Sequence, residues 1–224
     1  MELPVLWPVL LLGLSGALAQ TNLDQKVFVF PTSSTNSYIQ LKPHLPEPLR
    51  QFTVCLSFYS DLSRELALLS CASRNTDNEI LLLKYSPTLY QVAVGGNFHS
   101  YTVSGSTDRG SHWESVCVAW SSTTGIVQLW IDRMPRPRKG LSKDYAITTD
   151  LVMMLGQEQD SYGGSLDEKQ SFVGEITDVY MWDSVLPPEQ LRSIWRKIVP
   201  APVLNWTALN FEIKGYVVLE PSLD

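Results

Sequence analysis

The chain has 224 residues, of which 23 are acidic and 17 are basic, and its formal net charge is −6 at pH 7. This length is sufficient for one domain with a sizeable hydrophobic core. The mildly acidic balance argues against nucleic acid as a main partner and is compatible with divalent cation binding.

The N-terminus has the pattern of a secretory signal. Residues 3–18 are almost wholly apolar, and Ala17-Leu18-Ala19 forms an A-x-A cleavage site. The apolar run is too short for a typical transmembrane anchor. We therefore expect a signal peptide over residues 1–19 and a secreted mature protein over residues 20–224, with no transmembrane segment.

Alternation of apolar residues predicts that most of the chain is β-structure. In residues 52–59, Phe52, Val54, Leu56 and Phe58 fall on one face of a strand. Many short strands with regular turn signals predict an all-β fold of two packed sheets. Further strands are expected over residues 80–83, 90–94, 116–120, 126–131, 152–155 and 173–182.

The run LGQEQDSYGG, residues 155–164, is the most informative feature of the chain. With Asp167 and Gln170, it places Glu158 and Asp160 in a short segment that has no basic residue among its carboxylates. Carboxylates this close repel one another unless a cation lies between them, and carboxylate, amide and backbone oxygens suit calcium. The run lacks the EF-hand pattern, so by spacing alone it fits a solvated acidic loop equally well.

One helix is expected to begin at Pro187-Pro188, since prolines are tolerated in the first helical turn. Leu191, Ile194 and Trp195 then form an apolar stripe that we expect to pack on the sheets. The basic run over residues 133–139 is short and interrupted by prolines, which favours a solvated loop over a nucleic-acid or heparin patch.

Asn205-Trp206-Thr207 is a glycosylation sequon, which makes Asn205 a possible acceptor in a secreted chain. The apolar residues around it indicate partial burial, so the sequon can also remain unused.

The motifs LGQEQDSYGG, QSFVGEI and MWDSVLPPE resemble the short pentraxins, the family of C-reactive protein and serum amyloid P component. The likeness runs from about Lys26 to Pro221, and the overall divergence indicates a paralogue. The family signature His-x-Cys-x-x-Trp is matched around Cys117, with Ser115 in place of the histidine. The resemblance implies a two-sheet antiparallel jelly-roll sandwich of the lectin type with one helix in its C-terminal half.

Of the cysteines Cys55, Cys71 and Cys117, an oxidising compartment is expected to pair two, and the sequence alone allows any pairing. The resemblance implies the pair Cys55–Cys117. Such a bridge closes a loop of about 60 residues and contributes about 4 kcal/mol in the chain-entropy model. Cys71, in the run ALLSCAS, is then expected to be a buried core thiol.

The resemblance also implies two calcium ions per subunit, with Glu158 and Asp160 shared between them. Unfilled coordination positions would accept a phosphate, sulfate, carboxylate or vicinal diol, so anionic or carbohydrate ligands are expected. The second ion rests on Asp167 and Gln170 and is expected to bind more weakly. The matching ligand positions are Asp77, Asn78, Glu158, the backbone carbonyl of Gln159, Asp160, Asp167 and Gln170.

A ligand pocket beside the calcium ions is implied at Leu83, Ala93 and Phe98. In C-reactive protein these positions hold an apolar residue, a threonine and a glutamate that line a phosphocholine slot. Phe98 removes the carboxylate that meets the choline ammonium, and a ring face attracts a cation by only about 0.5–2 kcal/mol. We therefore expect weak phosphocholine binding. Phe98 fits a partly buried aromatic at a strand end equally well.

Short pentraxins form flat rings of five, so a homopentamer is expected. The family's Trp-Glu-Ser and C-terminal Lys-Pro segments become Trp120-Ser121-Ser122 and Glu220-Pro221, which puts a charge-paired subunit contact in doubt. Asp132-Arg133 replaces a hairpin Asp-Gly or Asn-Gly, although a non-glycine residue with positive φ is costly.

These features predict a secreted, calcium-dependent recognition protein with innate immune or debris-binding work, and not an enzyme. Two alternatives remain. Glu158-x-Asp160 resembles the start of the E-x-D-x-x-E run of jelly-roll glucanases, but Gly163 stands where the acid/base glutamate is needed. A structural or adhesion module would use calcium only to stiffen its loops.

Overall fold

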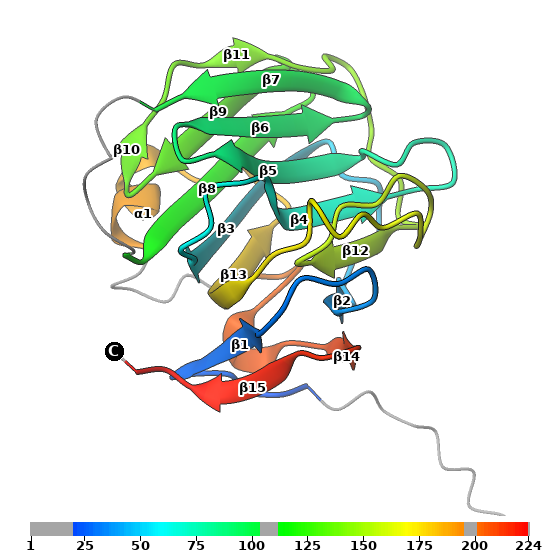
Figure 1. The fold of residues 1–224 in the computed structure, drawn as a ribbon. Coiled ribbons are helices and arrows are strands. Elements are labelled where there is room, and N and C mark those ends of the chain that lie inside the picture. Colours follow the sequence, from blue (N-terminus) through cyan, green and yellow to red (C-terminus); the bar gives the residue numbers. More distant parts are fainter. Residues whose placement is uncertain (1–19, 104–111, 195–200, 224) are drawn as a thin grey trace, which may run out of the picture.

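The computed structural model describes residues 20–103, 112–194 and 201–223. The expected signal peptide and Trp195 lie outside these ranges. The described chain folds into two antiparallel sheets with the short helices α1 (Pro188–Ser193) and η1 (Trp206–Ala208) (Figure 1).

The first sheet has the strand order β10-β9-β8-β3-β13-β1-β15, and β11 also pairs with β9. Neighbours in the sheet come from distant parts of the chain, as β13 lies between β1 and β3. The strands are β1 (Lys26–Phe30), β3 (Gln51–Tyr59), β8 (Glu114–Ser121), β9 (Ile126–Ile131), β10 (Met134–Pro135), β11 (Lys139–Gly140), β13 (Gly174–Trp182) and β15 (Val218–Pro221).

The second sheet has the order β14-β2-β12-β4-β5-β6-β7. Together the two sheets form the jelly-roll sandwich that the sequence predicted, so the fold class is confirmed. The strands are β2 (Tyr38–Leu41), β4 (Leu66–Ala72), β5 (Ile80–Ser86), β6 (Leu89–Val94), β7 (Asn97–Thr102), β12 (Val152–Leu155) and β14 (Phe211–Lys214).

The main core lies between the two sheets. In β3, Phe52, Val54, Leu56 and Phe58 are all 0% exposed and belong to this core, as their alternation predicted. Burial of each such side chain contributes about 1.5–3 kcal/mol. Cys71 in β4 is also buried here as a free thiol, which agrees with its predicted role.

A smaller apolar cluster lies on the outer face of the first sheet. Cys55 and Cys117 face each other across β3 and β8 and form a disulfide. The buried side chains of Leu191 and Ile194 pack against this bridge, so the expected packing of helix α1 is confirmed for these two residues. The cluster also includes Trp130, Trp182, Leu186 and Ala201.

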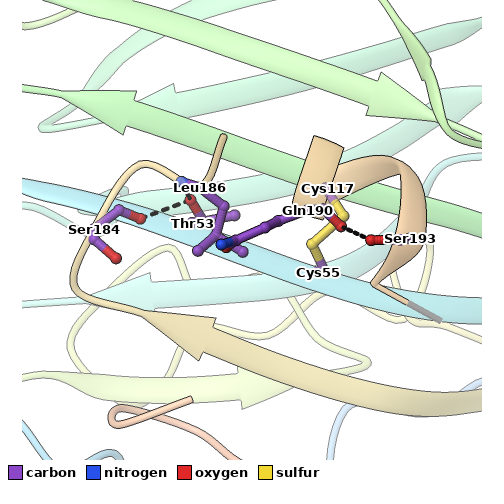
Figure 2. Close-up of a disulfide and its surroundings, with 7 residues drawn as sticks. All are labelled: Thr53, Cys55, Cys117, Ser184, Leu186, Gln190 and Ser193. Carbon is purple, nitrogen blue, oxygen red and sulfur yellow. Dashed lines mark hydrogen bonds between the residues drawn. A yellow bond between two sulfur atoms is a disulfide. The ribbon is translucent and has the colours of Figure 1, made fainter. Parts of the chain in front are cut away.

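Hydrogen bonds fix the segment that leads into α1. The Thr53 hydroxyl donates to the carbonyl of Ser184 at 2.7 Å and accepts from the Leu186 N–H at 2.9 Å (Figure 2). A side chain of β3 therefore holds the connection between β13 and the helix. No helix among the described residues is long and apolar enough to cross a membrane.

The β9–β10 turn has the positive φ values expected of a tight hairpin turn. Asp132 and Arg133 have φ values of 49° and 65°, in the left-handed region that favours glycine. The Asp132 carboxylate accepts from the Ser115 N–H at 3.0 Å, which ties the turn to β8. Arg133 and Arg138 are exposed, as a solvated basic loop requires.

Candidate metal centre

The long connection between β12 and β13 is anchored in the core. Its base is closed by the Phe172 N–H, which donates to the Gly156 carbonyl at 2.9 Å. The Phe172 ring packs edge-on against Phe30 and Phe58, with centroid distances of 5.4 and 6.2 Å. Gly156 has φ +86°, and a Cβ there would come within 2.3 Å of the Phe30 ring, so glycine is required.

Gln159 holds this loop against β4. Its backbone N–H donates to the Ser70 hydroxyl and its Nε2 to the Ser70 carbonyl, both at 3.1 Å, and Nε2 also donates to the Val152 carbonyl. Its Oε1 accepts from the Gly163 N–H at 3.1 Å. The Gln159 side chain is therefore occupied by hydrogen bonds to Ser70, Val152 and Gly163. This leaves the main-chain carbonyl as the Gln159 oxygen that a cation could use.

The turn between β4 and β5 supplies Asp77 and Asn78. The Asn78 side-chain Nδ2 donates to Asp77 Oδ1 at 3.1 Å, and the main-chain carbonyl of Asn78 accepts from the Gly96 N–H at 2.9 Å. Asn78 is 9% exposed, and its Oδ1 is buried without a hydrogen-bond donor among the described residues. Such a buried oxygen is costly unless a donor or a cation satisfies it.

Glu158 is the central acidic residue of the loop. It is 4% exposed, and its Oε2 has no hydrogen-bond partner in the described part of the chain. Burial raises its pKa to about 7, and the charges of Asp160, Asp77, Glu65 and Asp167 add to the increase. The negative charges of the loop and of the β4–β5 turn therefore act on one buried carboxylate.

The second half of the predicted ligand set is more open. Asp160 and Asp167 are exposed, and Asp167 Oδ1 accepts from the Lys169 N–H at 2.9 Å. Gln170 Nε2 donates to Glu65 Oε1 at 3.2 Å. Sequence reasoning missed Glu65, because a single glutamate far from the acidic run gives no signal of its own.

The predicted ligand residues offer carboxylate, amide and carbonyl oxygens, which are donor types that suit a hard cation such as calcium. Within residues 20–103, 112–194 and 201–223, no three or more His, Cys, Asp or Glu side chains are grouped so as to hold one metal ion. A cation bound here would satisfy the buried oxygens Asn78 Oδ1 and Glu158 Oε2.

An apolar wall lies on the outer face of the second sheet. Leu83 and Ala93 form a buried cluster with Ala67 and Leu81, separate from the main core. Ala93 lies opposite Phe98 of the edge strand β7, and Phe98 is 47% exposed. The three predicted pocket residues thus share one region of the sheet. Leu81, two residues from Leu83 on the same strand face, could have been found from the alternation.

Asn205 caps η1. Its Oδ1 accepts from the Thr207 N–H at 3.2 Å and from the Thr207 hydroxyl at 2.9 Å. The side chain is partly buried, in line with the apolar neighbours in the sequence, and its glycosylation stays a prediction.

Comparisons with known proteins show relatives that match nearly the whole chain. The Pentaxin family model matches residues 26–221. Serum amyloid P-component of Rattus norvegicus is 46% identical over 213 residues, which cover 94% of this chain and 91% of that protein. The Homo sapiens serum amyloid P-component is 44% identical over 222 residues, covering 99% and 98%. Homo sapiens C-reactive protein is 42% identical over 218 residues, covering 96% of each chain.

Among solved structures, a native heptameric SAP-like pentraxin from Limulus polyphemus is similar, with a TM-score of 0.81 and 23% identity. The match covers 91% of this chain and 98% of that one, and it shows the shared fold. Because the family model spans nearly the whole described chain and full-length relatives share this level of identity, the chain belongs to the pentraxin family, among its short members.

Proposed function

We propose that this protein is a secreted, non-enzymatic pentraxin that binds anionic, phosphorylated or carbohydrate ligands through a pair of calcium ions. The observation that carries this proposal is Glu158, a 4% exposed carboxylate among other acidic residues, whose Oε2 has no hydrogen-bond partner within the described ranges. A buried charge of this kind is costly unless an opposite charge offsets it. A divalent cation at the loop would supply that charge.

The predicted ligands divide between two positions that share Glu158 and Asp160. The first would add Asp77, Asn78 and the carbonyl of Gln159. The second would add Asp167 and Gln170. When bound, the calcium pair supplies positive charge and open coordination positions for ligand oxygens.

The apolar wall would orient a ligand held by the cations. Phe98, which lies opposite Ala93 on the neighbouring strand, is 47% exposed and is the accessible part of this wall, whereas Leu83 and Ala93 are 2% and 0% exposed and support it from beneath. A ligand whose anionic or diol end meets calcium could place a carbon skeleton on this wall. With no carboxylate at position 98, an ammonium group gains little there, so phosphocholine is expected to bind weakly.

Catalysis is not part of the proposal. A retaining glycosidase needs a second carboxyl group as acid/base. The corresponding position is Gly163, whose N–H donates to the Gln159 side chain. Loop stabilisation is the role that this contact supports.

We also propose assembly into a ring of five subunits. The Limulus relative is heptameric, so the subunit number of this chain has to be measured directly.

The decisive experiment is calcium titration of the mature protein by isothermal calorimetry, followed by capture on phosphoethanolamine, phosphocholine and sugar matrices with and without EDTA. The proposal expects two calcium ions per subunit and EDTA-reversible capture. The double variant Glu158→Gln with Asp160→Asn should lose both. A matched control, Glu47→Gln with Asp183→Asn, removes two exposed carboxylates outside the predicted ligand set and should change neither.

Equal calcium affinity in the wild type and the Glu158/Asp160 variant would overturn the site. Calcium binding without any EDTA-released ligand would instead support the structural or adhesion module.

A further inference from the structure

We propose that Glu65 belongs to the second cation position, where it orients Gln170 and adds a negative charge that tightens calcium binding. The inference rests on the proposed function and goes beyond the ligand positions implied by the family.

The first observation is the contact with Gln170. Gln170 Nε2 donates to Glu65 Oε1 at 3.2 Å. An amide group has donors on its nitrogen and acceptors on its oxygen, at opposite sides of the same plane. When Glu65 fixes the nitrogen, the Gln170 oxygen is turned away from Glu65 and remains available to a cation.

The backbone places Glu65 at this point. The Ala67 N–H donates to the Gln170 carbonyl at 2.9 Å. Arg64 Nη1 donates to the carbonyls of Lys169 and Ser171 at 3.0 and 2.7 Å. The segment that enters β4 is thus bonded on both sides of Glu65 to the end of the long loop.

The charge of Glu65 has no directly paired cation. Arg64 Nη1 donates to main-chain carbonyls, among them that of Glu65, and Nη2 donates to the Ser33 hydroxyl at 2.9 Å. Across the described residues, no ion pair joins the Glu65 carboxylate to a lysine or arginine. The Arg64 guanidinium interacts with Glu65 electrostatically without forming an ion pair, so the Glu65 charge is only partly offset and still acts on the neighbouring loop.

An independent observation points to a cation. Glu158, the ligand that the two positions would share, is 4% exposed and has an unpaired Oε2. Glu65 and Asp167 are both among the carboxylates whose charges act on Glu158. The second position then has acidic groups on Glu65, Asp167 and Glu158, which compensates for the exposure of Asp167.

The test is calcium calorimetry on the mature wild type and on Glu65→Gln, which retains a hydrogen-bond acceptor and loses the charge. We expect the weaker of the two calcium affinities to fall about three- to tenfold, as for one charge near a partly solvated divalent ion. The tighter affinity should stay unchanged. The difference should widen at low ionic strength, because screening weakens only the charge effect.

Two further variants make the result specific. Glu168→Gln removes an exposed acid from the same loop and should change the weaker affinity by less than about twofold. Glu65→Asp keeps the charge and shortens the side chain, and it should give an intermediate affinity. Melting temperatures in EDTA check that each variant folds.

The outcomes are distinguishable. If the wild type binds no calcium, the proposed function fails. If it binds two ions and Glu65→Gln retains both affinities, or if Glu168→Gln loses as much, the role of Glu65 is refuted while the calcium site stands.

Discussion

Glu158 is the residue at which a proton and the proposed calcium ion would compete. Its pKa of about 7 in the fold lies above its ordinary value of 4.5, first because of burial and then because of neighbouring carboxylates. A carboxyl group with a raised pKa contributes stability that is present below the unfolded value and lost as pH rises through the folded value.

In EDTA, the melting temperature of the mature protein should therefore fall as pH rises from about 5 to about 8. Glu158→Gln should flatten this slope, because the amide does not ionise. Burial also raises the pKa of Asp178 to about 6, so a smaller slope of the same sign should remain in the variant. Identical slopes in the two proteins would contradict the role of Glu158.

With calcium present, the dependence should reverse. Calcium needs the ionised carboxylate, so its affinity should fall by up to about tenfold per pH unit below 7 as one proton competes. Calorimetry across this pH range checks the prediction.

Phe98 is the predicted pocket position at which a cationic group of a ligand would be recognised. It is 47% exposed, so its substitution should leave the core intact. Phe98→Glu should strengthen calcium-dependent capture on phosphocholine by about tenfold, since a charged partner replaces a ring face. Phe98→Gln is the matched control and should give little gain. Equal capture by all three proteins would exclude position 98 from the ligand surface.

Among individual residues, the sequence predicted those that belong to a recognisable motif or to an alternating apolar pattern. The loop from Leu155 onward and the Asp77-Asn78 turn were recognisable because they are short, contiguous patterns. Glu65 was not, because its relation to Gln170 exists only after β4 and the loop lie side by side. The exposure of Phe98 was open for a similar reason, since it depends on whether another element covers β7.

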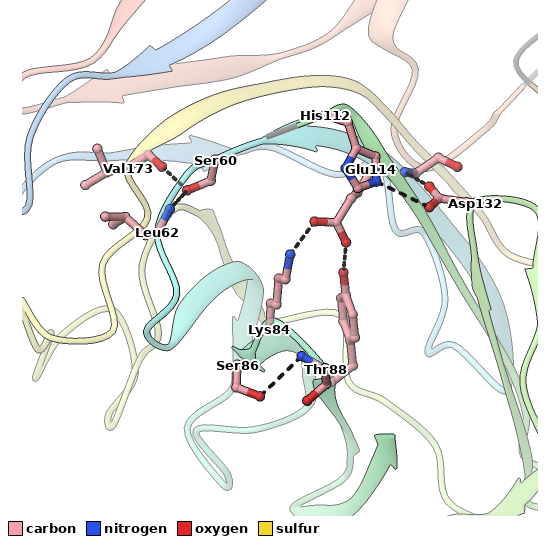
Figure 3. Close-up of polar contacts among 11 residues, drawn as sticks. Ser60, Leu62, Lys84, Ser86, Thr88, His112, Glu114, Asp132 and Val173 are labelled. Atoms are coloured by element: carbon pink, nitrogen blue, oxygen red, sulfur yellow. Dashed lines mark hydrogen bonds and ion pairs between the residues drawn. The ribbon is translucent and has the colours of Figure 1, made fainter. Parts of the chain in front are cut away.

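Among the elements, the two sheets are joined by a buried polar link. Lys84 of β5 forms an ion pair with Glu114 of β8 (Figure 3). The Tyr90 hydroxyl of β6 donates to the same carboxylate at 2.5 Å. Lys84 is 7% exposed, and its ammonium lies 5.2 Å from the centre of the Phe58 ring. Because few waters can reach it, the ammonium depends on Glu114 for its counter-charge.

Glu114→Gln should lower the free energy of unfolding by about 3 kcal/mol, since it leaves Lys84 buried and unpaired. The double variant Lys84→Met with Glu114→Gln should recover most of this loss. Urea denaturation at a fixed protein concentration measures both. Glu212→Gln, which removes an exposed partner of Lys42 and Lys214, should have little effect. Equal destabilisation in the single and double variants would refute the pairing argument.

Strand prediction succeeded for part of each sheet. The expected strands 126–131 and 152–155 coincide with β9 and β12, and 52–59 differs from β3 by one residue. The strands outside the expected ranges are β1, β2, β4, β7, β10, β11, β14 and β15. Of these, β1, β2, β14 and β15 have only four or five residues each and pair with distant segments. Their stability comes from these partners rather than from their own pattern.

For the whole molecule, the helix and the candidate cation site occupy different sides. Helix α1 packs with the disulfide on the outer face of the first sheet, whereas the long loop and the β4–β5 turn lie beside the second sheet (Figure 1). The apolar wall of Leu83 and Ala93 is also on the second sheet. A ligand at the cation site would therefore leave the helix face uncovered and free for other contacts.

Ring assembly is the prediction that belongs to this scale. The resemblance predicts a charge-paired subunit contact at the positions of Ser121, at the end of β8, and Glu220, exposed in β15. Without a charge pair, ring assembly should depend only weakly on salt. The ring should also be weaker than one with the charge pair, so that it begins to dissociate at a higher protein concentration on dilution. Sedimentation velocity of the wild type across a dilution series should show pentamers that dissociate on dilution.

Ser121→Glu with Glu220→Lys places opposite charges at these two positions and should strengthen each contact by about 0.2–1 kcal/mol. Because a closed ring of five repeats the contact in every interface, dissociation should shift to clearly lower concentration, and the shift should shrink at high salt. Ser121→Glu alone puts like charges at the two positions and should weaken the ring instead. A single variant that stabilises the ring as well as the double variant would show that these positions do not meet across subunits, and a persistent monomer at micromolar wild-type concentration would rule out the ring itself.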